Sequence, residues 1–239
     1  MLQDITIENV LFLDIETVPV QATFNELNDT MQELWDKKSV FFRKEEETAE
    51  DVYQRAGIYS EFGKIICISV GHIIYKNNEP TFRVKSFYSD DEKQLLEEFS
   101  AMLQKFSTRP DALLCAHNGK EFDFPYIARR MLINGLKLPT LLDIAGKKPW
   151  EVKHLDTLEL WKFGDYKNYT SLNLLTTVFN IPSPKDDIDG SMVADVYWKD
   201  KDLERIVTYC EKDVLAVAQL ILRYRGEEII NENSIERVS

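Results

Sequence analysis

Apolar residues are arranged along this chain in short strand-like runs near the N-terminus and in helically spaced stripes further on. The run over residues 10–19 predicts a buried strand that ends at a proline. Residues 64–75 and 81–88 predict a hairpin with a turn at 76–80, so the sheet is expected to begin antiparallel. A further short run at 111–116 follows a helical segment, which favours parallel pairing with the first strand.

Helical spacing predicts helices in several of the intervening segments. Residues 24–59 are expected to be mostly helical, as an insertion between two strands. Ser89-Asp90-Asp91-Glu92 matches a capping box, with Ser89 as the N-cap of a helix that ends before Pro110. The remaining helices are expected at 126–133, 171–179, 191–198 and 202–228, and 153–160 fits a strand or a short helix.

Length and composition indicate a single mixed α/β domain. The chain has 239 residues, of which 44% are hydrophobic, enough for one sizeable core. We expect this domain to span residues 1–230 and to contain the helical insertion at 20–62, while the polar tail at 231–239 is expected to fray. The chain has neither an apolar run of about 18 residues nor a signal-peptide pattern, so a soluble, cytoplasmic protein without membrane contact is expected.

Charge narrows the kinds of partner the protein can have. A formal net charge of −12 argues against a protein that coats long nucleic acid, because phosphate neutralisation requires clustered lysine and arginine. It is compatible with a nuclease that grips only a strand end with metal ions and a small basic patch. Residues 1–63 hold 14 acids and 5 bases, whereas residues 129–167 hold 8 bases and 5 acids, so a polyanion is expected to approach the second segment.

The cysteines and histidines give no catalytic pattern. The cysteines are widely separated, lie in apolar surroundings and are expected to be buried reduced thiols; they are Cys67, Cys115 and Cys210. The three histidines are expected to be structural or surface residues; they are His72, His117 and His154.

Two acids stand one residue apart in the first strand. Residues at i and i+2 of a strand point to the same face, so Asp14 and Glu16 are expected to project side by side. Their repulsion requires compensation by a shared proton or a divalent cation, and oxygen ligands of this kind suit Mg²⁺ or Mn²⁺. Taken alone, the pair also fits a solvated strand end.

Further acids lie at the edges of apolar elements. Asp123 comes at the start of a helix, and Asp213 lies beside the buried stripe of the last helix. Tyr209 precedes Asp213 by four residues, so the phenol and the carboxylate share one face of that helix. Considered by itself, Asp213 is equally compatible with a surface or salt-bridged acid. Asp156, Asp186 and Asp187 receive no assigned role, although Asp156 is a candidate for supporting the ligands from behind.

Taken together, these residues resemble the DEDD group of 3′-5′ exonucleases, in particular the proofreading domains of family B DNA polymerases. The first motif of that group is similar to Phe12-Leu13-Asp14-Ile15-Glu16-Thr17, the second to Asn118-Gly119-Lys120-Glu121-Phe122-Asp123, and the third to Tyr209-Cys210-Glu211-Lys212-Asp213. Thr208 stands where histidine-type relatives carry histidine, which indicates the tyrosine subgroup. The resemblance covers residues 10–225 and implies a ribonuclease H-like mixed sheet flanked by helices.

The resemblance also implies roles for individual residues. Two divalent cations, Mg²⁺ or Mn²⁺, would be held by Asp14, Glu16, Asp123 and Asp213, with Asp14 bridging both ions. Tyr209 would orient the attacking water. Thr17, Asn118 and Phe122 would contact the last nucleotide, with Phe122 stacking on its base or serving as a core residue. Basic and aromatic residues that are weaker candidates for lining the strand are Tyr166, Lys167, Tyr169 and Lys185.

The activity implied is hydrolysis of single-stranded DNA from its 3′ end to 5′-nucleotides. RNA is the alternative substrate, and a non-catalytic nucleic-acid-binding relative is a further alternative, although all four acids and the tyrosine are present. An aspartyl-nucleophile phosphatase fits less well, because Glu16 stands where that mechanism needs a second aspartate. The 239 residues contain no polymerase segment, so a separate polymerase or repair partner is expected, its identity open.

Overall fold

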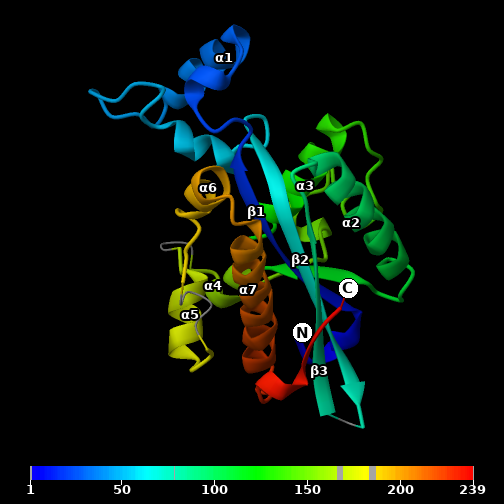
Figure 1. Cartoon of the computed structure of the whole chain (residues 1–239). Coiled ribbons are helices and arrows are strands. Elements are labelled where there is room, and N and C mark those ends of the chain that lie inside the picture. Colours follow the sequence, from blue (N-terminus) through cyan, green and yellow to red (C-terminus); the bar gives the residue numbers. More distant parts are fainter. Residues whose placement is uncertain (1, 78, 166–168, 183–186, 239) are drawn as a thin grey trace.

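The structure is a computed structural model that describes residues 2–77, 79–165, 169–182 and 187–238. Its centre is a six-stranded mixed sheet. Helices flank this sheet (Figure 1). The strand order is β5-β4-β1-β2-β3-β6. The strands are β1 (Val10–Pro19), β2 (Gly63–Lys76), β3 (Glu79–Tyr88), β4 (Leu113–Ala116), β5 (Leu155–Asp156) and β6 (Ile235–Arg237). β1 pairs antiparallel with β2 and parallel with β4. The predicted α/β fold with a central first strand is therefore confirmed.

The helices surround this sheet and connect its strands. They are α1 (Asp29–Ser39), α2 (Glu92–Phe106), α3 (Asp123–Ile133), α4 (Thr157–Lys162), α5 (Leu172–Val178), α6 (Val193–Asp195) and α7 (Leu203–Tyr224). A π-helical turn, Val196–Asp200, follows α6. Short 3-10 helices are formed by Leu2–Asp4, Ile7–Asn9, Phe24–Glu26, Tyr53–Ile58, Pro149–Glu151 and Glu232–Ser234. Within the described residues, none of the helices combines the length and the hydrophobicity that a bilayer-spanning segment requires.

The two faces of β1 are covered by different helices. Leu11, Leu13 and Ile15 are buried in one cluster with apolar residues of α2 and α3. Val10 and Phe12 are buried in another cluster, with the apolar stripe of α7. Because successive side chains of a strand alternate between faces, Asp14 continues the series that faces α7. This alternation places the candidate acids between the sheet and the long C-terminal helix.

The insertion between β1 and β2 contains less α-helix than the sequence predicted. Only α1 is α-helical, and Trp35 from this helix is fully buried in a small cluster of the insertion's own apolar residues. After α1 the chain turns, because side chains occupy the backbone donors: Glu47 accepts the N–H of Lys44 at 2.8 Å, and Asp51 accepts that of Thr48 at 2.8 Å. The expectation of helix over residues 24–59 is therefore met by α1 and by the short 3-10 helices Phe24–Glu26 and Tyr53–Ile58, but not by the segment between α1 and Tyr53.

The start of α2 also differs from the capping box predicted at Ser89. Asp91 is the N-cap, and its carboxylate accepts the N–H groups of Lys93 and Gln94. Glu92 does not reach back to the cap, because its carboxylate accepts the N–H of Ile65 at 2.7 Å and pairs with Arg130. A tertiary ion pair has displaced the local cap.

The C-terminal tail is ordered where fraying was expected. β6 pairs parallel with β3, and Ile235 packs against the cluster on the α7 face. Arg237 Nε donates to Glu211 of α7 at 2.6 Å. Apolar and ionic contacts therefore hold this polar segment at the edge of the sheet. The expectation of free, buried thiols is confirmed for all three cysteines.

Candidate active site

Two acids of β1 lie at the point where this strand runs past the end of its parallel neighbour. β4 pairs with β1 only as far as Phe12, so among the described residues the β1 backbone beyond Phe12 has no strand partner on that side. Glu16 is buried, with 7% of its surface exposed, and Asp14 is partly buried. The register with β2 shifts directly after Glu16, which is a bulge of the kind that often accompanies functional sites.

The third segment of the site is the first half of α7. Tyr209, Cys210 and Asp213 are all buried on the side of this helix that faces the sheet. The phenol of Tyr209 lies near the carboxylate of Asp213 one turn later, and this acid contributes to raising the pKa of the phenol. The prediction that Asp213 belongs to the buried side of the helix is confirmed, since only 8% of its surface is exposed.

Asp123 joins these residues from the opposite layer of the fold. It is the first residue of α3, which packs on the other face of the sheet, and 3% of its surface is exposed. The backbone N–H groups of Asp123 itself and of Ile15 lie close enough to its carboxylate to lower its pKa. Asp123 therefore lies beside the backbone between Asp14 and Glu16.

The pKa values of the site indicate a crowded set of anions. Burial raises the pKa of Asp14 well above its usual range, and the charges of three neighbouring carboxylates raise it further; these are Asp213, Glu16 and Asp123. The pKa of Asp123 is raised to about 7. Burial is the largest cause, and the charge of Asp156 raises this pKa further. Burial and the charge of Asp213 likewise raise the pKa of Tyr209, so its phenol stays protonated at neutral pH. The structure thus brings together four acids predicted from three distant segments.

These residues are chemically suited to a divalent cation. The ligand atoms of Asp14, Glu16 and Cys210 all lie within 4.8 Å of one another. Carboxylate oxygens are the donors that Mg²⁺ and Mn²⁺ prefer, and a cation would relieve the repulsion that raises the pKa of Asp14. The donor set therefore fits the metal ions that the sequence motifs imply.

Cys210 is a member of the cluster that sequence reasoning treated only as a core thiol. Its Sγ donates to Asp14 Oδ2 at 3.4 Å, and the same sulfur lies 3.5 Å from the backbone oxygen of Asp14. The sequence signal was its place in the third motif, directly after Tyr209 and three residues before Asp213. On a helix this spacing turns the thiol toward the same strand as the two motif residues.

Asp156 supports the loop that precedes Asp123. It is 2% exposed, and its Oδ1 accepts the N–H groups of Asn118 at 3.0 Å and Leu158 at 2.9 Å. Its Oδ2 accepts the N–H of Lys120 at 3.1 Å. The same carboxylate caps α4, so one side chain fastens the second motif to the end of β5. The sequence assigned this residue no definite role and named it only as a candidate for supporting the ligands from behind.

The residues expected to contact a terminal nucleotide occupy different environments. Thr17 is partly buried beside the phenol of Tyr126, which donates to the backbone oxygen of Gly57 at 2.7 Å. Phe122 is also partly buried, with its ring centroid 5.3 Å from that of Tyr126. Asn118 has a positive φ of 64° and lies partly exposed in the loop held by Asp156.

A second aromatic residue reaches the neighbourhood of Asp123. Tyr169 as a whole is 65% exposed. Partial burial raises the pKa of its phenol, and the charge of Asp123 raises this pKa further. Its ring lies 6.1 Å from that of His117, which hydrogen-bonds to Thr157 and to the backbone of Thr170. The structural role expected of His117 is therefore confirmed. The other weak candidates for strand contacts lie outside the described residues; they are Tyr166, Lys167 and Lys185.

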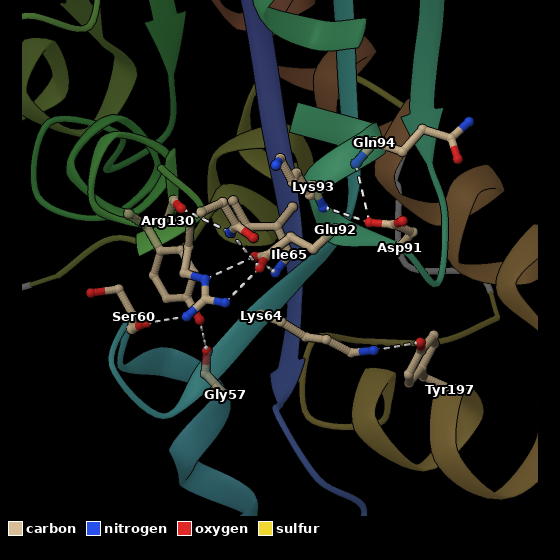
Figure 2. A network of polar contacts seen from close by, with 12 residues as sticks. Gly57, Ser60, Lys64, Ile65, Asp91, Glu92, Lys93, Gln94, Arg130 and Tyr197 are labelled. Atoms are coloured by element: carbon tan, nitrogen blue, oxygen red, sulfur yellow. Dashed lines mark hydrogen bonds and ion pairs between the residues drawn. The ribbon is translucent and has the colours of Figure 1, made fainter. Parts of the chain in front are cut away.

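Arg130 fixes the position of the helix that carries Asp123 (Figure 2). Its guanidinium forms a two-pronged pair with Glu92, at 2.8 Å and 2.5 Å, and donates to the backbone oxygen of Ser60 at 2.8 Å. Both members of the ion pair are buried. This finding removes Arg130 from the basic surface expected over residues 129–167.

The central strand of this α/β fold meets acids from two flanking helices. Together these acids form a carboxylate cluster suited to metal ions. Residues 58–233 match the family described as predicted 3′-5′ exonucleases related to the exonuclease domain of PolB. This match covers more than half of the chain, and the protein belongs to that family. The matched region includes the second and third motifs, whereas Asp14 and Glu16 precede it.

Proposed function

We propose that the protein is a metal-dependent 3′-5′ exonuclease that hydrolyses single-stranded DNA to 5′-nucleotides. The observation that carries this proposal is the convergence of Asp14, Glu16, Asp123 and Asp213 with Tyr209, from three segments far apart in the sequence. Membership of the exonuclease family supports the reaction class and a nucleic acid substrate. We propose residues 1–230 as the catalytic domain, with residues 20–62 inserted in it and 231–239 as its tail.

Two Mg²⁺ or Mn²⁺ ions would be held by the four carboxylates. When bound, such ions activate water and neutralise the charge that develops on the phosphate oxygens. The protein's own part is to hold its acids in place: the central strand β1 supplies Asp14 and Glu16, and the start of α3 brings Asp123 beside the backbone of Ile15. Cys210 restrains Asp14 through its thiol.

Tyr209 is proposed to orient the attacking water through its phenol. Its raised pKa keeps the hydroxyl protonated, so it acts as a hydrogen-bond partner and not as a base. Thr17, Asn118 and Phe122 are proposed to contact the terminal nucleotide. Asn118 lies in a loop fixed by Asp156, and Phe122 immediately precedes Asp123, so both are adjacent to the acids.

The test is an assay on 5′-labelled single strands of DNA and RNA, with Mg²⁺, Mn²⁺ or chelator. The wild-type protein is expected to give ladders of shortening products with metal and none with chelator. Asp14→Asn and Asp213→Asn are expected to abolish them, while Asp29→Asn, an exposed acid at the start of α1, is the matched control. Immediate release of labelled mononucleotide would reverse the proposed polarity.

The same assay separates the alternatives. Faster degradation of RNA than of DNA would make the protein an exoribonuclease. Binding of either strand without cleavage under every metal condition would indicate a non-catalytic relative and overturn the proposal. We further propose that the protein acts together with a separate polymerase or repair protein.

A further inference from the structure

A pocket of about 480 Å³ lies beyond the acid cluster, where β2 begins. It is lined by Lys64, Asp90, Tyr197, Trp198, Lys201 and Leu203. Lys64 pairs across the sheet with Val18, which follows Glu16 by two residues, or roughly 7 Å of strand. Val18, Tyr197 and Tyr209 are packed in one apolar cluster, so the pocket and the candidate active site share a wall.

Lys64 is held in this pocket by aromatic groups (Figure 2). Its Nζ donates to the phenol oxygen of Tyr197 at 2.8 Å, and that phenol donates to Asp90 at 2.6 Å. The ammonium also lies 4.8 Å from the ring centroid of Tyr197 and 5.0 Å from that of Trp198. An ammonium has three N–H donors. Within the part of the chain that the structure describes, Lys64 Nζ forms one hydrogen bond, to Tyr197.

A second ammonium approaches the same indole. Lys201 Nζ lies 4.9 Å from the Trp198 ring centroid, and Trp198 Nε1 donates to the backbone oxygen of Pro19 at 3.2 Å. The indole is thus hydrogen-bonded to the end of β1, and the ammonium groups of Lys64 and Lys201 both lie against its ring. Among the residues that the structure describes, neither lysine forms an ion pair with a carboxylate within 4 Å, although the protein carries a net charge of −12.

The electrostatics of this pocket favour an anionic ligand. Burial lowers the pKa of Lys64. The charges of Asp90 and Glu92 oppose part of this effect, whereas Lys201 and Arg130 add to it, and the pKa remains below its usual value. A bound anion would offset both the burial and the nearby cations, because it compensates for lost hydration and separates the like charges. Asp90 is the carboxylate within the pocket, and it already accepts the Tyr197 hydroxyl.

We propose that Lys64, Lys201 and Trp198 form a binding site for the phosphodiester backbone of a single strand whose 3′ end occupies the acid cluster. This inference rests on the proposed exonuclease function. The lysines take the place of a broad basic surface, and they lie along the direction in which β1 leaves the acids. Both lysines already contact the Trp198 ring, so the ligand is the phosphate and not a particular base, and binding is sequence-independent.

Binding is tested with the inactive Asp213→Asn protein and fluorescein-labelled 12-mers of oligothymidylate and oligoadenylate. Anisotropy titrations over a range of KCl concentrations give the salt dependence of the affinity. Lys64→Gln and Lys201→Asn are each expected to weaken binding of both strands and to lower the slope of log K against log salt by about 0.7. Lys199→Gln, on the same turn and paired with Asp195, is the matched control.

Lys201→Asn keeps the test independent of folding, because asparagine tolerates the left-handed conformation of this residue, whose φ is 58°. Unchanged affinity and slope in both variants would overturn the inference. An effect on one strand sequence alone would replace phosphate recognition by base recognition.

Hydrolysis by the otherwise wild-type protein separates this inference from the proposed function. The lysine variants are expected to raise KM for a 12-mer several-fold with a smaller change in kcat. Cleavage by the wild-type protein with no change of KM in the variants refutes the subsite and retains the exonuclease. Lysine-dependent binding without any cleavage by the wild-type protein refutes the exonuclease and retains the subsite.

Discussion

The carboxylate of Asp156 accepts the backbone N–H of Asn118 at 3.0 Å and thereby joins the end of β5 to the loop that leads into Asp123. The same side chain accepts the N–H of Lys120 at 3.1 Å. Asn118 adopts a left-handed conformation, so this loop depends on tertiary hydrogen bonds for its shape. Asp156 is therefore a positioning residue for the candidate metal ligand.

Asp156→Ala is expected to lower kcat by about 10- to 100-fold, because a displacement of about 1 Å at a reacting centre has an effect of this size. The loss of hydrogen bonds to a buried carboxylate is also expected to lower the free energy of unfolding by about 1–3 kcal/mol. Asp91→Ala is the control, since it removes the N-cap of α2 away from the acids. Equal losses of kcat in both variants, at matched stability, would refute a positioning role.

Tyr209→Phe is expected to slow hydrolysis without weakening metal binding. The change removes the hydroxyl that is proposed to orient the attacking water, and a hydrogen bond to a charged group contributes about 1.5–3 kcal/mol, or roughly 10- to 100-fold in rate. Thermal shifts produced by Mn²⁺ should equal those of the wild-type protein. Tyr88→Phe, which removes a phenol bonded to Glu204 of the same helix, is the control. Wild-type kcat in Tyr209→Phe would exclude this phenol from the reaction.

The metal-free protein is expected to lose stability as the pH rises. The pKa of Asp123 is raised to about 7 in the folded state, so its contribution is fully present below its unfolded pKa of about 4 and is lost as the pH rises through about 7. The raised pKa of Asp14 acts in the same direction. The melting temperature should therefore fall between about pH 4 and 7, less steeply in Asp123→Asn, and Mn²⁺ should reverse the fall. A flat profile in both proteins would contradict this account.

Arg130→Met is expected to destabilise the protein by about 3–5 kcal/mol, because it leaves the buried carboxylate of Glu92 without its cation. Denaturant unfolding monitored by circular dichroism measures this change. Lys199→Met removes an exposed ion pair with Asp195 and is expected to cost at most about 1 kcal/mol. Similar losses in the two variants would show that the Arg130 pair is not a fixed point of the fold.

The sequence predicted best those helices and strands whose apolar residues recur with a regular period. Alternation gave the hairpin of β2 and β3, and helical spacing gave α3, α5 and the whole of α7, which ends at Tyr224, before the predicted residue 228. The insertion was overpredicted because α1 ends where side chains take over the backbone donors, as Asp51 does for Thr48. Spacing alone does not reveal this competition.

The order of the candidate acids, and the strand and helices that carry them, can be predicted from residue spacing, because periods of 2 and 3.6 residues place particular side chains on one face. Their surroundings depend on how the chain packs. Glu92 pairs with Arg130 across 38 positions, Asp156 reaches Asn118 across 38, and Cys210 reaches Asp14 across 196. A buried polar group takes whichever partner the packed chain brings within hydrogen-bond distance, and no local pattern encodes that choice.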